Sequence, residues 1–258
     1  MQWWCSASGQ SWTWAWRAYP GVWLLIGLLA YGYWRATRTQ AHDGRWIGGW
    51  IGVVLTWIAL DWPLGPLGAG YTASAHAVQF VLIALTAPPL ILRGLAPSAE
   101  ATFPEGSGRY RVLRVITQPL LAAMFFNVVT IATHVPTVVD ILMPNQVGAF
   151  AIDFFWLLSG LAFWWPVVID VPRRPHFPTM VKVLYIFLGT LVHTGVAIVM
   201  LMAEFPMYGI YELAPPTGWF SPIDDLEVAG GVMELGGVAV VFGIMSVMFF
   251  RWVGRQEE

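Results

Sequence analysis

The chain alternates long apolar stretches with short polar ones, and seven of the apolar stretches are long enough to cross a bilayer as helices. A helix needs about 20 residues, most of them apolar, to span the hydrocarbon core. We therefore predict an all-α integral membrane protein, a seven-transmembrane-helix bundle in a single polytopic domain. The predicted domain covers residues 1–258, with spans near 15–34, 46–62, 74–95, 114–134, 147–169, 180–203 and 227–251.

Three of the polar connections carry structural signals of their own. The connection DWPLGPLGAG contains Pro63 and Pro66, which are expected to stop any helix there. The connection 136–145 begins with Pro136, a residue favoured at the first helical position, so one or two helical turns are expected on the surface. The connection 204–225 mixes Tyr, Trp, Phe and Pro, which favours a folded cap at the membrane interface over a free linker.

The basic residues predict how the bundle is oriented. Twelve of the thirteen Lys and Arg residues fall in four clusters on alternate connections, and only Arg17 lies on the other side. Short loops rich in Lys and Arg stay in the cytoplasm, so the N-terminus is expected outside and the C-terminus inside. The clusters are Arg35, Arg38 and Arg45; Arg93, Arg109, Arg111 and Arg114; Arg173, Arg174 and Lys182; and Arg251 with Arg255.

The composition agrees with residence in lipid and excludes several classes of function. Apolar residues make up 57% of the chain, charged residues 11%, and there are sixteen Trp. With a net charge of −2 and basic residues distributed by topology, a nucleic-acid partner is not expected. The single cysteine, Cys5, forms neither an internal disulfide nor a cysteine-based metal site by itself. The sequence has no Ser-His-Asp, zinc-binding or phosphate-cradling motif, so an enzyme is not expected.

Polar side chains gather at one depth, near the predicted outer ends of five spans. An ionisable residue at the centre of a span costs about 2.5–3.5 kcal/mol or more, so such residues indicate a functional site. Met and His bind Cu(I), and His with carboxylate binds Cu(II). We therefore predict a copper site with the candidate ligands His76, His134, Asp153, Glu234, Met200, Met202 and Met233, oriented by Gln79 and Asp225.

Each of these residues also has a structural interpretation, under which no metal is bound. A single His at a helix end is commonly an interfacial hydrogen-bonding residue, and Met in an apolar chain commonly packs. His193, near the middle of span six, is expected to bond to a neighbouring helix. Asp153 and Glu234 are harder to explain by packing, because they lie in apolar runs. Haem held between His76 and His134 is a further alternative.

The stretch HAVQFVLIALTAPPLILRGLAP (76–97) resembles the third span of the CtaG family of cytochrome c oxidase assembly factors. In that family a His, two residues and a Gln-His pair lead through an apolar run to a Pro-Pro pair. The resemblance covers about residues 20–253 and continues in order through the Thr-His pair at 133–134, LSGLAFWWPVV (158–168) and SPIDDLEVAGGVM (221–233). It places His76, Gln79, His134, Asp225 and Met233 at matching positions.

The resemblance implies a multi-pass protein of the bacterial cytoplasmic (inner) membrane that takes part in building a respiratory haem–copper oxidase. The family is associated with copper delivery to that oxidase or formation of its copper centre. Oxidase subunits and membrane lipid are the implied partners, and copper is the implied ligand.

The chain departs from the family pattern at two places, and this leaves two functions open. Phe80 stands where the family has a second histidine after the Gln, and Ala149, Ile152 and Asp153 stand where span five has a His and a Glu-His pair. One function is copper handling during oxidase assembly. The other is a structural accessory subunit of a respiratory or other energy-transducing complex that kept the fold and binds no metal. Phe80 and Ala149 favour the second; the outer polar cluster, changed in composition but still present, favours the first.

Overall fold

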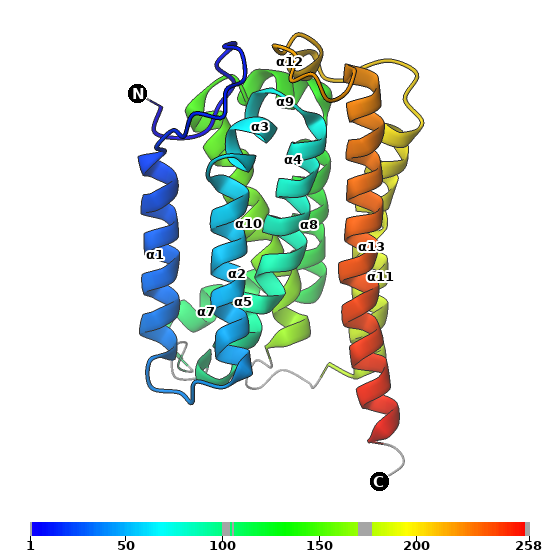
Figure 1. The fold of residues 1–258 in the computed structure, drawn as a ribbon. Helices are drawn as coiled ribbons and strands as arrows, with labels where there is room; N and C mark the ends of the chain where they lie inside the picture. Colours follow the sequence, from blue (N-terminus) through cyan, green and yellow to red (C-terminus); the bar gives the residue numbers. More distant parts are fainter. Residues whose placement is uncertain (1, 100–103, 105, 170–176, 256–258) are drawn as a thin grey trace.

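The computed structural model of the chain describes residues 2–99, 104, 106–169 and 177–255, whose long helices stand side by side in one bundle (Figure 1). The predicted all-α fold is confirmed. Two members of the predicted basic clusters, Arg173 and Arg174, lie outside the described residues. The described helices are α1 (Pro20–Thr37), α2 (Gly44–Leu60), α3 (Leu64–Gly70), α4 (Ala73–Phe80), the π-helix η1 (Val81–Thr86), α5 (Ala87–Leu95), the 3-10 helix η2 (Ala96–Ser98), α7 (Gly108–Ile116), α8 (Pro119–Ala132), α9 (Pro136–Leu142), α10 (Gln146–Val168), α11 (Thr179–Leu201), α12 (Gly209–Glu212) and α13 (Pro222–Gly254).

The length and surface of the helices show that this is a membrane protein. Four helical stretches, Ala73–Ser98 and the helices α10, α11 and α13, are long and apolar enough to cross a bilayer. Two bent pairs, α2 with α3 and α7 with α8, bring the number to six if each pair is one span. The sides of the bundle expose large apolar residues such as Leu28, Val128 and Leu235, at 61%, 61% and 73%. Such a surface is stable in hydrocarbon.

Prolines explain where two predicted spans end or bend. The helices α7 and α8 meet at 65°, because Pro119 begins α8 and the residue before a proline avoids the helical conformation. Within the predicted span 114–134, the helix α8 therefore begins only at Pro119, and residues 114–116 belong to α7. The prediction that Pro63 and Pro66 stop any helix is confirmed for α2, which ends at Leu60, and is wrong for Pro66, which α3 contains. Pro66 lies in the first turn of α3, where a backbone N–H has no helical partner to lose.

The third predicted span contains a wide turn, η1, that the sequence pattern did not indicate. Pro88 has no backbone N–H, so the carbonyl of Ala84 loses its usual helical partner. The turn widens, and the Thr86 hydroxyl donates to the carbonyl oxygen of Val81 at 2.9 Å. Gly160 of α10 packs directly on this turn, where an added Cβ would meet the carbonyl oxygen of Ala84. A glycine is therefore required for α10 to approach η1 this closely.

One end of the bundle, which we call the tail end, carries the N-terminal tail (residues 2–19), α3, α9 and α12 (Figure 1). The predicted surface helix within 136–145 is confirmed as α9. The predicted folded cap is also confirmed. Asp140 of α9 accepts hydrogen bonds from the backbone N–H groups of Gly209 and Ile210, at 3.2 and 3.0 Å, and so fixes the start of α12.

The opposite end, which we call the basic end, is where α1, α5 and α13 finish and where α7 lies (Figure 1). The described Lys and Arg residues other than Arg17 belong to helices and turns at this end. The helix α13, with 33 residues, begins at the tail end and finishes at the basic end. The fold therefore gathers the described Lys and Arg residues other than Arg17 at one end of the bundle, as the sequence predicted.

Candidate metal site

Two buried histidines lie next to each other inside the tail end of the bundle. His76 lies on α4, whose start is fixed by Thr72: its side chain accepts from the backbone N–H of Ala75 at 3.4 Å. His134 follows Thr133, the C-cap residue of α8. Their ring centroids are 6.2 Å apart, and the two residues are 4% and 5% exposed. Both residues were predicted from the sequence as ligands, and the fold brings them together.

The hydrogen bonds of His134 identify the nitrogen that carries a lone pair. Its Nδ1 lies 2.8 Å from the carbonyl oxygen of Thr130, and because a carbonyl only accepts, Nδ1 carries the proton. Its Nε2 has no partner among the described residues, and neither has either ring nitrogen of His76. The backbone of Gly68 approaches the His76 ring outside normal hydrogen-bonding geometry. A ring N–H held by a carbonyl, with the other nitrogen free, is typical of a metal-binding histidine.

Aromatic side chains enclose the histidine pair. The ring centroid of Trp156 on α10 lies 4.7 Å from that of His76 and 6.0 Å from that of His134. The ring of Tyr211 on α12 lies 6.0 Å from that of His76. Burial raises the pKa of Tyr211, so its hydroxyl stays neutral and donates to the carbonyl oxygen of Gly68 at 2.7 Å. These rings exclude water from the pair. Neither Trp156 nor Tyr211 was among the predicted site residues.

Phe80 lies between the histidine pair and a third buried histidine, His193. Its ring centroid is 5.0 Å from that of His134, edge-on, and 5.6 Å from that of His193, stacked. His193 is 2% exposed, its ring contacts α13 at Gly237, and its Nε2 has no partner among the described residues. Phe80, the position at which the resemblance implies a second histidine, is therefore central to the site, and its apolar ring fills that position.

Asp153 is engaged by the N-terminal tail. The indole Nε1 of Trp4 donates to its Oδ2 at 2.8 Å, and both residues are buried, at 1% and 5% exposure. The tail is held there because the side-chain oxygen of Gln146 accepts from the backbone N–H groups of Trp3 and Trp4, at 2.6 and 3.2 Å. Asp153 thus has a structural hydrogen bond at the position where the sequence predicted a ligand. Its role as a ligand stays a prediction.

Gln79 and Asp225 position the helix that carries His76. The side-chain N–H of Gln79 donates to the carbonyl oxygen of Ala59 on α2 at 2.8 Å. Asp225 of α13 accepts from the backbone N–H groups of Ala73 and Ser74, at 2.5 and 3.3 Å, and from the Ser74 hydroxyl. A carboxylate at a helix N-terminus satisfies free N–H groups and favours the helix dipole. These two residues therefore orient α4 as a whole.

The remaining predicted ligands lie along α11 and α13. Met200 and Met233 are buried, at 2% and 0% exposure, whereas Met202 is 76% exposed. Glu234 is half-buried, and its Oε2 has no partner among the described residues. Within the described part of the chain, no group of three or more His, Cys, Asp and Glu side chains is arranged to hold a metal ion. The His76–His134 pair is the part of the predicted set that the fold clearly assembles.

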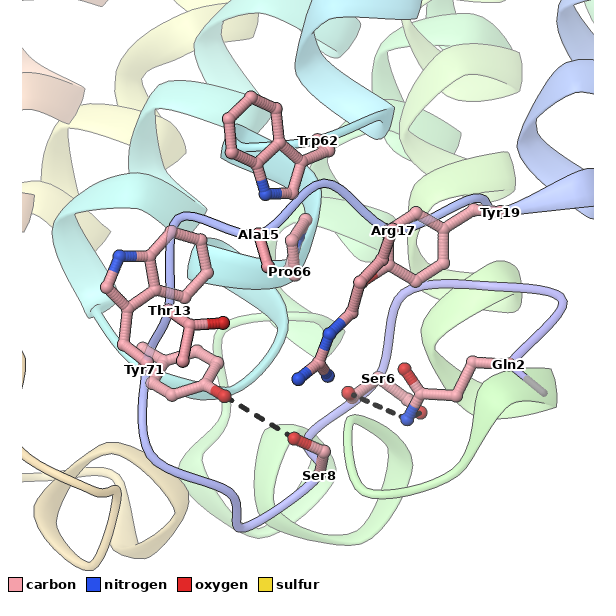
Figure 2. A pocket seen from close by; sticks show the side chains of 11 residues that line it. Gln2, Ser6, Ser8, Thr13, Ala15, Arg17, Tyr19, Trp62, Pro66 and Tyr71 are labelled. Carbon is pink, nitrogen blue, oxygen red and sulfur yellow. Dashed lines mark hydrogen bonds between the residues drawn. The ribbon is translucent and has the colours of Figure 1, made fainter.

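A small pocket within the tail is a separate feature (Figure 2). The guanidinium of Arg17 points into it and donates to the side-chain oxygen of Gln10 at 3.2 Å. The hydroxyls of Ser8 and Tyr71, also in its wall, lie 3.4 Å apart. Its volume is about 10 Å³, which is room for about one water molecule. We attribute this pocket to the packing of the tail.

Comparisons with known proteins identify the family. A family model described as cytochrome c oxidase caa3 assembly factor (Caa3_CtaG) matches residues 27–255. No curated protein and no solved structure matches the chain. The family match includes both histidines of the pair, Phe80, and the helices that hold them, and a family of assembly factors suggests a role other than catalysis. The chain therefore belongs to the cytochrome c oxidase caa3 assembly factor family.

Proposed function

We propose that the protein holds copper transiently at the outer face of the bacterial cytoplasmic membrane and passes it to a subunit of a haem–copper cytochrome c oxidase during assembly. Membership of the family supports the oxidase assembly role. Copper is the cargo in this proposal, and the protein catalyses no reaction. The observation that carries the proposal is the buried pair of His76 and His134, whose nitrogen lone pairs have no partner among the described residues.

The chemistry of two imidazoles suits a carrier. Metal–nitrogen bonds are about 2 Å long, so two imidazole rings that share one ion have centroids about 5 Å apart at a tetrahedral angle and about 6 Å apart when the two nitrogens and the ion are nearly in line. The observed separation of 6.2 Å supports such sharing. Imidazole is a good copper ligand, and an ion held by few donors moves readily to a partner with more. Additional donors to the ion are proposed to be Glu234, Met200 and Met233. Asp153 could donate once Trp4 no longer holds it, and Met202 could donate at the surface.

The proposed orientation has seven spans, with the tail end outside. Six spans follow if each bent pair crosses once, and α1 is proposed as the seventh because it stands beside them (Figure 1) and exposes Leu24 and Leu28 at 65% and 61%. The basic end then faces the cytoplasm, as short basic loops do. This orientation puts the histidine pair in the outer leaflet.

Fusions that report their compartment test the orientation. A reporter after Glu258 is expected in the cytoplasm. A reporter inserted at Gly218, an exposed residue of the cap, is expected outside, because exposed loop tips tolerate insertion. Measuring alkaline phosphatase and fluorescent-protein fusions at both positions checks this. Signals from the same compartment at both positions contradict the seven-span arrangement.

Removal of the histidine pair tests the copper site. The double variant His76→Ala/His134→Ala is expected to lower copper bound per protein by about tenfold or more, because loss of even a ligand-orienting group costs 10–100-fold in metal affinity. Oxidase activity in cells should fall and recover partly when copper is added, since mass action compensates for weaker binding. Metal analysis of the protein purified in mild detergent, with oxidase assays on membranes, gives the answer.

His42→Ala is the matched control, because His42 is an exposed histidine before α2, stacked on Trp46, at the basic end. It should leave copper content and oxidase activity unchanged. Equal copper in the double variant, the control and the unaltered protein contradicts a site at the pair.

A structural accessory subunit is the second candidate function. It is favoured by Phe80, whose apolar ring occupies the position between His134 and His193 that a ligand would otherwise take. Under this function the unaltered protein carries no copper and stays attached to a mature complex in fixed stoichiometry. Quantitative mass spectrometry of the purified oxidase distinguishes the two functions.

A further inference from the structure

Two adjoining cavities lie at the basic end of the bundle, far from the histidine pair. One, of about 460 Å³, lies between α5, α10 and α13, and its walls are mainly apolar. The other, of about 690 Å³, extends it toward α11 and the start of α2. They share Val168, Met248 and Arg251 and so form one space, which we call the basic-end groove. Each volume is within the range of pockets that hold small molecules, about 300–1,000 Å³.

The course of α13 explains why the groove exists. The helix packs against α4, η1 and α11, then continues toward the basic end. There Val240, Gly243 and Val247 of α13 face Pro89 and Leu90 of α5 across the first cavity. A Cβ added at Gly243 would meet nothing within 4 Å, so this wall has open space in front of it.

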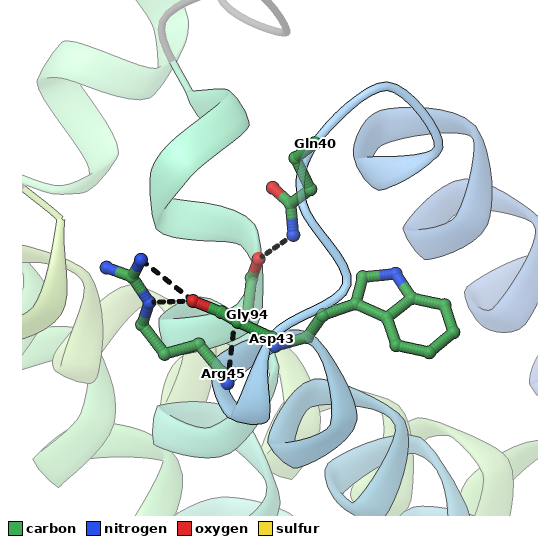
Figure 3. Close-up of polar contacts among 5 residues, drawn as sticks. Gln40, Asp43, Arg45 and Gly94 are labelled. Carbon is green, nitrogen blue, oxygen red and sulfur yellow. Dashed lines mark hydrogen bonds and ion pairs between the residues drawn. The ribbon is translucent and has the colours of Figure 1, made fainter.

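The described residues that line the groove carry charge of one sign. Five basic residues line it, and none of its described lining residues is acidic; the five are Arg45, Arg93, Lys182, Arg251 and Arg255. Arg45 forms an ion pair with Asp43, because its Nη2 and Nε each lie 2.9 Å from the Asp43 carboxylate (Figure 3). The hydrogen bond from Arg45 lowers the pKa of the Asp43 carboxyl. Arg93 and Arg251 are exposed and make no hydrogen bond or ion pair with the described residues. They are available to an anion.

We propose that the basic-end groove binds one anionic phospholipid of the inner leaflet. An acyl chain lies in the apolar cavity between α5 and α13, and the phosphate group contacts Arg93 and Arg251. An apolar wall that ends at unpaired guanidinium groups matches an amphiphile with an anionic head, and basic pockets on the cytoplasmic side of helix bundles suit such head groups. This site goes beyond the proposed copper function and shares no residue with it.

The head-group contact is tested with the purified full-length protein in vesicles of phosphatidylcholine that contain a minor share of phosphatidylglycerol. Each Lys or Arg near anionic lipid contributes about fivefold in affinity, so Arg93→Gln/Arg251→Gln should lower phosphatidylglycerol binding by about 30-fold. Arg35→Gln/Arg38→Gln removes the same charge at the same end from residues outside the groove. It should leave binding unchanged. Native mass spectrometry and lipid titration measure how much phosphatidylglycerol the protein retains.

The acyl-chain contact needs a second pair of variants. Gly243→Leu fills the apolar cavity without a steric conflict, and Gly231→Leu adds the same side chain to the same helix where a Cβ also meets nothing within 4 Å. Only Gly243→Leu should lower phosphatidylglycerol retention. If Gly243→Leu binds phosphatidylglycerol as well as Gly231→Leu does, the site recognises only a free anionic group and the proposal is overturned.

Two further results overturn the proposal. One is an equal loss of phosphatidylglycerol binding in the two double variants, Arg93→Gln/Arg251→Gln and Arg35→Gln/Arg38→Gln. Such a result indicates a general attraction of the basic end to anionic lipid. The other concerns a photoreactive residue at Val247, in the groove wall. Crosslinking in cells to a polypeptide in place of lipid would identify a protein segment as the occupant.

Discussion

The variant Phe80→His is expected to raise the affinity for Cu(I) by about 100-fold. The new imidazole would lie between His134 and His193, whose ring centroids are 5.0 and 5.6 Å from that of Phe80. Loss of a group that only orients a ligand costs 10–100-fold in metal affinity, so a new direct ligand should contribute about the upper value. The variant converts a histidine pair into a larger imidazole cluster and introduces the histidine that the family resemblance implies at this position.

Competition with a Cu(I) chelator measures this gain in the purified protein. Phe163→His is the matched control, because Phe163 is equally buried and its ring stacks on those of Phe126 and Tyr185, with centroids 4.6 and 5.1 Å apart. The control should destabilise the protein to a similar degree through burial of a polar ring and leave copper affinity unchanged. An equal effect of the two variants contradicts a copper site centred on the histidine pair.

Gly160→Leu is expected to lower the free energy of unfolding by about 4 kcal/mol or more. Overpacking in a core typically costs 1–3 kcal/mol, and here the added side chain meets the backbone carbonyl of Ala84 and the ring of Pro88, whose Cγ lies 2.9 Å from the added Cβ. A backbone atom does not rotate away, so α10 must separate from η1. Little protein should remain in the membrane, as immunoblots and thermal unfolding in detergent will reveal.

Gly27→Leu provides the comparison, since Gly27 of α1 is exposed and an added Cβ there meets nothing within 4 Å. It should accumulate and unfold like the unaltered chain. A stable, abundant Gly160→Leu protein that has only lost its partner complex would place the close contact at an external interface. The fold instead puts the contact within the chain, between α10 and η1.

The sequence predicted the helices well wherever apolar length alone determines them. The predicted spans 147–169 and 180–203 differ from α10 and α11 by at most two residues at each end. It failed where backbone hydrogen bonds compete locally, at Pro66 inside α3 and at Pro88 after η1. These backbone hydrogen bonds depend on where each proline lies within its helix, and the spacing of apolar residues does not report that position.

The candidate site was predicted in part for a similar reason. His76 and His134 were identified because polar residues are costly in lipid, and the fold does place them together. The pattern did not show that Trp4 would engage Asp153, because these residues are 149 positions apart. Trp156 lies one turn from Asp153 on the same helix, and that spacing was a signal for its place in the site.

The long sequence separation of the contacts at the tail end has a consequence for biogenesis. The backbone N–H of Ala73, at the start of α4, donates to the Asp225 carboxylate, which lies 152 residues later in the chain. This hydrogen bond forms only after Asp225 has been synthesised. At about 5–20 residues per second of synthesis, that interval is roughly 8–30 s. During this time the start of α4, the helix that carries His76, lacks the contact with Asp225. If the protein carries copper as proposed, it can bind the ion at this site only after nearly the whole chain has been synthesised, because Asp225 lies near the C-terminal end of the sequence.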